Sequence, residues 1–325
     1  MDTDVIPPED DAAQPVLVEI VRSGFVEGVH RGRLVLLEAD GSVALEIGDA
    51  RRTLLPRSCN KPMQAVGMLE AGLALEAELL AIAAGSHSAQ DFHIAAVRKI
   101  LAEAGLAEDA LRTPAARPGD ERALIEFYRR GEQDAPIYYN CSGKHAAMLS
   151  ASARNGWPTE TYLDPAHPVQ QACRAAIERL TGEPVAAEAV DGCGAPLYGF
   201  SLLGLARAVR NCVTAEPGTH ERLVADAMRA HPEYVAGEGA LDTVAMRSVP
   251  GLLAKTGAES VYVAALADGR TVAFKIDDGA KRAQPVVLAE ALRRLDVPAT
   301  AVAAFGSVPL LGGGRPVGEL RPVFG

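Results

Sequence analysis

Long apolar runs, basic blocks and paired cysteines are all missing from this sequence of 325 residues. Because no run of about 18 or more apolar residues occurs, the sequence contains no candidate for a membrane-spanning helix. Because basic blocks are missing and the formal net charge is −10, the chain would repel phosphate backbones. We therefore expect a soluble protein whose partners include neither nucleic acid nor a membrane.

The five cysteines are odd in number and include no Cys-x-x-Cys pair, so no disulfide framework is indicated. The N-terminus is acidic where a signal peptide would be cationic and then apolar. We expect reduced thiols in the cytoplasm, and residues 1–13 as a disordered acidic tail. Hydrophobic residues make up 48% of the chain, which is enough for a large core without disulfides.

Extended segments gather at the two ends of the chain, and helical periodicity fills the middle. Residues 33–37 and 43–47 flank an Asp-Gly turn, as do residues 260–266 and 271–276, so each pair predicts a hairpin. A further extended run lies at 16–21. Helices are expected at 58–72, 76–84, 92–101, 144–155, 169–180, 197–210, 220–230 and 281–294.

This order of elements predicts the α+β class. The simplest arrangement is an antiparallel sheet built from both chain ends, with a helical lobe inserted between them. We expect residues 14–325 to form a single domain of two lobes.

The first candidate for catalysis is the Ser-x-x-Lys motif of Ser58 and Lys61. At the start of a helix these side chains lie on one face, about 5–6 Å apart at Cβ, so the amine can take the serine's proton. For that the lysine must be neutral, which requires burial or a neighbouring cation. The motif is weak by itself, because a serine near a helix start is usually a cap.

A second motif strengthens this interpretation. Lys255-Thr256-Gly257 precedes a late strand, and Ser-x-x-Lys with Lys-Thr-Gly are two of the three marks of serine β-lactamases and penicillin-binding proteins. The third mark, Ser-Asp-Asn, is missing. Ser86, in a Ser-His-Ser segment, could present a hydroxyl in its place. The two motifs together favour acyl transfer at a serine.

Two further segments contain metal-capable side chains. Asn-Cys-Ser-Gly-Lys-His at 140–145 precedes a predicted helix, and Asp-Gly-Cys-Gly-Ala-Pro lies at 191–196 between predicted helices. Thiolate, imidazole and carboxylate groups all bind zinc, but the paired-cysteine spacing of structural zinc sites is missing. Spacing alone leaves open a zinc site or buried thiols in tight turns.

In this order the motifs resemble the L-asparaginases that have a serine-β-lactamase-like fold, a zinc-containing type with homodimeric members. The resemblance extends from Val18 to about Arg321. It rests on the segments already quoted and on His-Pro-Glu-Tyr-Val-Ala-Gly at 231–237 and Lys-Ile-Asp-Asp-Gly at 275–279. The sequence departs from the family pattern at Tyr139, where a small polar residue is common, so the shape of the pocket is in doubt there.

The resemblance implies hydrolysis of the side-chain amide of L-asparagine to L-aspartate and ammonia. It implies two Ser–Lys pairs, which map onto Ser58 with Lys61 and Ser86 with Lys255. It also implies one zinc ion and a homodimer. The zinc ligands map onto Cys141, Lys144 and Cys193. We assign the substrate pocket to His145, Asp191, Arg57 and His30, the last in a short connection between extended runs.

Two alternatives stay open at this point. The first is a β-lactamase-like amidohydrolase that acts on another acyl donor. A glutaminase is the nearest of these, because glutamine is longer than asparagine by one methylene, which a pocket discriminates by only about 1–3 kcal/mol. A non-catalytic zinc-binding protein is the third hypothesis, and the presence of all four serine and lysine residues counts against it. Between Ser58 and Ser86, we predict Ser58 as the nucleophile with Lys61 as its base.

Overall fold

A computed structural model describes residues 14–324, and the predicted acidic tail lies outside these residues. The main sheet has strands in the order β10-β11-β1-β2-β9-β8-β7, with β3 also paired to β2, and every pairing is antiparallel. Its strands are β1 Val16–Arg22, β2 Phe25–Leu37, β3 Val43–Ile47, β7 Leu253–Thr256, β8 Val261–Ala265, β9 Thr271–Ile276, β10 Pro309–Gly312 and β11 Arg315–Pro322. The α+β class and a sheet built from both chain ends are therefore confirmed.

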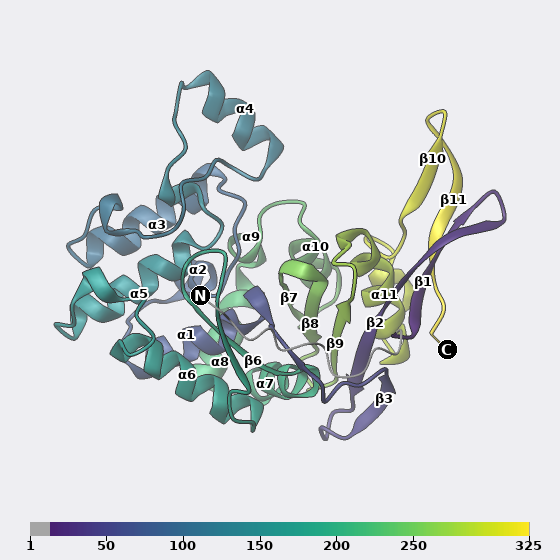
Figure 1. Ribbon diagram of the computed structural model, residues 1–325, viewed down its shortest axis with the longest axis horizontal. Coiled ribbons are helices and arrows are strands. Elements are labelled where there is room, and N and C mark those ends of the chain that lie inside the picture. The colour runs from purple at the N-terminus through teal and green to yellow at the C-terminus, as the bar shows by residue number, and fades with distance from the viewer. Residues whose placement is uncertain (1–13, 325) are drawn as a thin grey trace, which may run out of the picture.

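The helices in the middle of the chain form the lobe beside this sheet, and two further helices follow β9, of which the first packs against the sheet (Figure 1). Their bounds are α1 Lys61–Glu70, α2 Ala77–Ala83, α3 Asp91–Glu103, α4 Glu121–Arg129, α5 Ser142–Arg154, α6 Pro168–Thr181, α7 Leu202–Thr214, α8 His220–Ala230, α9 Pro232–Val235, α10 Leu241–Ser248, α11 Gln284–Arg294 and α12 Ala299–Val302. Helix α1 is buried along almost its whole length and packs against α5, α6 and α8. Helix α7 joins the lobe to the sheet, because it contacts both α6 and strand β9.

Both predicted hairpins are confirmed, and their Asp-Gly turns explain why the chain reverses there. Gly41 and Gly269 have φ of 88° and 96°, a region that glycine enters without steric cost. Across the turns, Leu37 pairs with Val43 and Ala265 pairs with Thr271. The register places buried side chains of β2 and β9 on the core.

The sequence prediction was wrong where a short strand precedes a helix. Residues 197–201, predicted as the start of a helix, lie in strand β6 Pro196–Ser201, which pairs with β5 Ala187–Val190 and β4 Thr53–Leu54. Helix α7 begins only after Ser201, whose side chain caps it by accepting from the backbone N–H of Gly204. The prediction also missed helices α4 and α10 and the β10–β11 hairpin.

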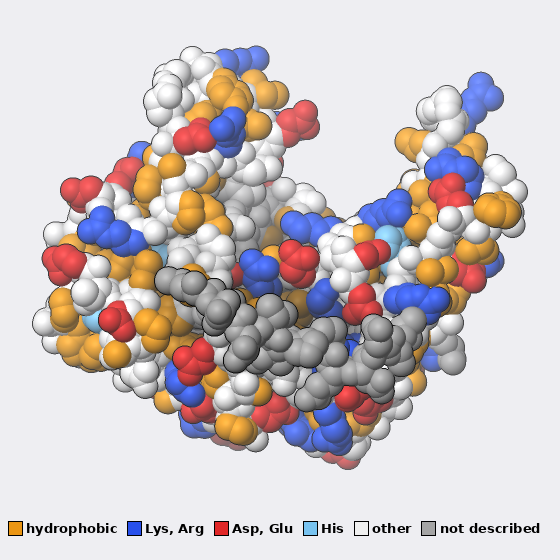
Figure 2. Space-filling view, viewed as in Figure 1, with side chains coloured by type: hydrophobic (Ala, Val, Ile, Leu, Met, Phe, Trp, Pro, Cys, Tyr) orange, Lys and Arg blue, Asp and Glu red, His pale blue; other side chains and the backbone are white. Residues whose placement is uncertain are grey.

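The molecule is hollowed on one side, between α4 and the projecting hairpins of β1–β2 and β10–β11 (Figure 2). Charged side chains of both signs gather toward the floor of this hollow. Across residues 14–324, none of the helices has the length and apolar character needed to cross a membrane.

Candidate active site

Two buried lysines from distant parts of the chain meet at one serine hydroxyl. Ser86 lies in the segment that follows α2, and its Oγ is 2.9 Å from Lys61 Nζ and 3.0 Å from Lys255 Nζ. Lys61 is the first residue of α1, and Lys255 lies on β7. Both lysine side chains are completely buried. The helical lobe and the sheet therefore each supply one amine to the same oxygen.

Each lysine also donates to a backbone carbonyl, which fixes its position. Lys61 Nζ lies 2.5 Å from Gly85 O, and Lys255 Nζ lies 2.7 Å from Thr256 O. The pKa of Lys255 is lowered to about 8, chiefly by burial and also by the charge of Lys61, while Asp242 opposes the shift. Near pH 8, Lys255 can therefore accept or release a proton.

Ser58 does not make the predicted bond to Lys61. It lies half-buried in the 3-10 turn η1 Arg57–Asn60, and its side chain has no hydrogen bond among the described residues. The helix begins only at Lys61, so Ser58 precedes the regular α-helical spacing that the prediction assumed. Arg57, with φ of 51°, turns the backbone sharply just before it. The Lys61 amine forms its side-chain hydrogen bond with Ser86 instead.

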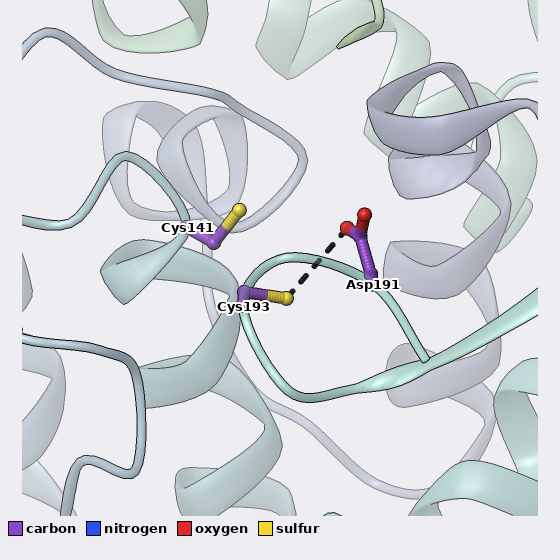
Figure 3. A group of neighbouring side chains, drawn as sticks. All are labelled: Cys141, Asp191 and Cys193. Carbon is purple, nitrogen blue, oxygen red and sulfur yellow. Dashed lines mark hydrogen bonds between the residues drawn. The ribbon is translucent and has the colours of Figure 1, made fainter. Parts of the chain in front are cut away.

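Two of the predicted metal ligands, Cys141 and Cys193, lie together beside Asp191 (Figure 3). Cys141 stands at the N-cap of α5, and Cys193 lies in the turn between β5 and β6. Their sulfur atoms and an Asp191 oxygen are all within 4.8 Å of one another. Lys144 Nζ lies 3.3 Å from Cys193 Sγ, and that sulfur lies 3.7 Å from Asp191 Oδ2. The tertiary structure thus brings together all three ligands that the resemblance implied.

The electrostatics of this cluster favour a thiolate beside ammonium groups. A hydrogen bond from Cys193 holds the pKa of Cys141 well below its usual range, and the charges of Lys61 and Lys144 act in the same direction. The pKa of Cys193 is raised, because its thiol donates to Cys141 and is also buried. Although burial opposes it, the negative sulfurs raise the pKa of Lys144. The cluster therefore favours a thiolate on Cys141, a thiol on Cys193 and an ammonium group on Lys144.

These residues fit a zinc ion. Two buried sulfurs and a carboxylate are donors that zinc accepts, and Lys144 would join them once it loses its proton. His145 lies beside the cluster on α5, its Nδ1 is 2.7 Å from the Tyr162 hydroxyl, and its buried Nε2 has no hydrogen-bond partner among the described residues. Burial lowers the pKa of this imidazole while the neighbouring Cys193 opposes the shift, so His145 offers a further nitrogen donor beside the cluster for a cation or a substrate.

Arg57 and Asp191 form an ion pair at the edge of this cluster. Arg57 Nε lies 2.8 Å from Asp191 Oδ1. Burial acts to raise the pKa of Asp191, but the charges of Lys144 and Arg57 outweigh it and the pKa is lowered. On its other side, Arg57 Nη1 lies 4.0 Å from Glu259 Oε1. Sequence reasoning missed Glu259, which follows Lys-Thr-Gly by two residues.

His30 is placed differently from the other predicted pocket residues. It lies within strand β2 rather than in a connection, and it is buried. Its Nδ1 is 2.6 Å from Asp278 Oδ2, and Arg282 Nε donates to its Nε2 at 3.1 Å. None of its hydrogen bonds reaches Ser86 or the cysteine cluster in the described chain. A role for His30 toward substrate stays a prediction.

His87 was missed as part of the site. It follows Ser86, and its Nε2 lies 2.9 Å from Ser142 Oγ, while its backbone N–H donates to Asn140 O at 3.1 Å. Its Nδ1 accepts from the backbone N–H of Ala89, so the proton is on Nε2. These contacts clamp the segment around Cys141 to the segment around Ser86. The Ser-His-Ser triplet at residues 86–88 was the sequence signal by which His87 could have been assigned to the site.

A hydroxyl held by two buried amines, beside a cluster of cation-binding groups, is suited to acyl transfer with release of an amine. The chain matches the L-asparaginase II family from residue 18 to residue 322, and it belongs to that family. This membership places it among the hydrolases that cleave amide bonds. No curated protein matches the chain.

Several solved structures resemble the chain at low sequence identity. A β-lactamase from Mycobacterium bovis is 12% identical, with a TM-score of 0.41, over 77% of this chain and 88% of the other. A Bacillus glutaminase is 11% identical, with a TM-score of 0.41, over 76% of this chain and 83% of the other. Mglu, in its tris and glutamate form, is 14% identical, with a TM-score of 0.43, over 87% of this chain and 63% of the other.

Proposed function

We propose that this protein is an L-asparagine amidohydrolase that acts through a serine ester. The observation that carries the proposal is the meeting of Lys61 and Lys255 at Ser86 Oγ, in a chain of the L-asparaginase II family. A serine oxygen bonds to the side-chain carbonyl carbon, the carbon–nitrogen bond breaks, and the nitrogen leaves as ammonia with the proton of the serine. Water then cleaves the ester and releases L-aspartate.

Ser58 is the proposed nucleophile, and Ser86 is the proposed proton relay. A hydroxyl oxygen has two lone pairs, and while both lysines are charged their N–H groups occupy both lone pairs of Ser86. Ser58 is half-buried and makes no side-chain hydrogen bond among the described residues, so its lone pairs are free. Its proton would pass through Ser86 to a lysine rather than directly to Lys61.

The proposed cofactor is zinc, held by Cys141, Lys144 and Cys193. A bound zinc ion supplies a fixed positive charge that orients a substrate carboxylate or amide oxygen. Asp191 pairs with Arg57 and stays available as a partner of the substrate's amino group, while Arg57 is available to its carboxylate. Lys144 must release a proton before it can bind a metal.

The test compares ammonia release from L-asparagine and L-glutamine side by side, with Ser58→Ala as the control for contaminating activity. We expect kcat/KM to favour asparagine by about 10–200-fold, because one methylene changes the fit by about 1–3 kcal/mol. A preference for glutamine would support the glutaminase alternative. Release from neither amide by the metal-loaded protein would refute the proposal and support a non-catalytic zinc-binding protein.

We also propose a cytoplasmic homodimer. The projecting strands expose large apolar side chains, with Phe25 at 70% and Leu311 at 58% exposure. Apolar side chains gathered on a projecting arm favour a protein contact over solvent. A second copy is the expected occupant, as the resemblance to homodimeric asparaginases implies.

A further inference from the structure

A buried carboxylate is joined to the strand that carries Lys255. Asp242 is the second residue of α10, and its side chain is 1% exposed. Its Oδ2 accepts from the backbone N–H of Thr256 at 2.9 Å. Asp242 lies in none of the motifs that the sequence singled out, and the proposed chemistry does not use it.

The position of β7 in the sheet explains why this contact is needed. Strand β7 is the last strand of the main sheet, so one of its edges has no strand partner among residues 14–324. The N–H of Gly257 donates to Val261 O of the neighbouring β8 segment. Alternate residues of an antiparallel strand face opposite edges, so the N–H of Thr256 faces the free edge, where Asp242 accepts it. Without Asp242 this partly buried donor would lose its partner.

The contact continues through Thr256 to the reacting groups. The carbonyl of Thr256 accepts from Lys255 Nζ at 2.7 Å, and the same nitrogen donates to Ser86 Oγ. A line of hydrogen bonds therefore runs from the Asp242 carboxylate through one residue of β7 to the lysine and the serine. A displacement of Thr256 would move the carbonyl that holds the lysine amine in place.

Asp242 is also the carboxylate that faces Lys255. The titratable groups around Lys255 are Asp242 from α10, Lys61 from α1, Cys59 from η1 and Cys141 from the segment before α5. Burial and Lys61 lower the pKa of Lys255, whereas Asp242 raises it. Asp242 has no basic partner among the described ion pairs, and its Oδ1 makes no hydrogen bond there. Burial and the charge of Asp242 together raise the pKa of Tyr262 and of Cys59, so this charge acts on those two buried groups as well as on Lys255.

We propose that Asp242 is a positioning residue, which anchors the free edge of β7 and keeps Lys255 in place and able to hold a proton beside Ser86. This inference rests on the proposed function, in which Lys255 exchanges a proton with Ser86. In this role Asp242 acts through Lys255 and contacts neither the substrate nor the metal ion.

The test measures the titration of Lys255 directly. The chain contains six lysines, so a protein labelled at lysine Cε gives a small set of resonances, and Lys255→Met identifies the one for Lys255. Asp242→Asn retains an oxygen that can accept from Thr256 but removes the charge. We expect the pKa of Lys255 to fall by about one unit or more, and the acidic limb of kcat/KM against pH to move down with it.

Glu238→Gln is the matched control, because Glu238 is exposed, lies just before α10 and pairs with Arg247. It should leave both the titration and the pH profile unchanged. An unchanged Lys255 titration in folded Asp242→Asn would overturn the proposal. If that variant does not fold, Asp242→Glu retains the charge but alters the contact, and we expect a lower kcat with an unchanged titration; an unchanged kcat would overturn the proposal. If the wild-type protein releases no ammonia, the proposed function fails, while the titration still decides the role of Asp242.

Discussion

Replacing each of the two serines separately would distinguish the nucleophile from the relay. Ser58→Ala removes a half-buried hydroxyl that has no hydrogen-bond partner among the described residues, so the fold should be unchanged. Ser86→Ala removes the oxygen that two buried amines share. Ser88→Ala is the matched control, because Ser88 lies two residues further along the same segment and bonds to Gln90 rather than to a lysine.

We expect the two substitutions to lower kcat by different factors. Loss of a nucleophile typically removes about 10⁴-fold or more of kcat. Loss of a proton relay removes about 10²–10⁴-fold, or about 3–5 kcal/mol of transition-state stabilisation. After Ser86→Ala, each buried amine retains a carbonyl partner, Gly85 O for Lys61 and Thr256 O for Lys255. We therefore expect Ser86→Ala to fold and to form an ester slowly.

The assay combines ammonia release with intact-protein mass after acid quenching in excess L-asparagine. We expect a covalent adduct of one aspartyl group on Ser58 in the wild type and in Ser86→Ala, and none in Ser58→Ala. Peptide mapping of the quenched protein locates the ester. An adduct on Ser86, or near-wild-type turnover by Ser58→Ala, would refute this division of roles and make Ser86 the nucleophile.

The same geometry supports four further predictions. Cys193→Ser should lower the zinc content of the purified protein while buried Cys173→Ser should not; an unchanged content in Cys193→Ser would exclude this site. Turnover should rise from pH 7 to 9, because the pKa of Lys255 is about 8, and a flat profile or a maximum below pH 7 would exclude a lysine base. The lowered pKa costs about 3 kcal/mol of stability at and below pH 7. Because the unfolded chain holds more protons between pH 8 and 10.5, stability to urea should rise with pH there, and this gain should be lost in Lys255→Met. Phe25→Asp should shift the mass in light scattering from dimer to monomer, and an unchanged mass would place any dimer contact elsewhere.

Local patterns in the sequence were sufficient for much of the fold. The two Asp-Gly turns, the cap at His167 with Pro168 after it, and the stop at Gly182 are determined by residues next to one another, and the structure has all of them. The strand at 196–201 was not predicted, because its pairing to β4 at Thr53–Leu54 joins distant parts of the chain. Helical periodicity in the residues that follow it extended the prediction backwards.

In the site, the sequence by itself determined which residue types are present and in which order. Which groups touch was decided only by the tertiary structure. Lys61 is three residues from Ser58 yet bonds to Ser86, 25 positions away, because α1 begins at the lysine and directs its side chain toward the segment after α2. Asp242 belongs to none of the sequence motifs, and its proposed role depends on β7 being an edge strand. Contacts between distant segments depend on how the sheet and the helical lobe pack, and no local spacing contains that information.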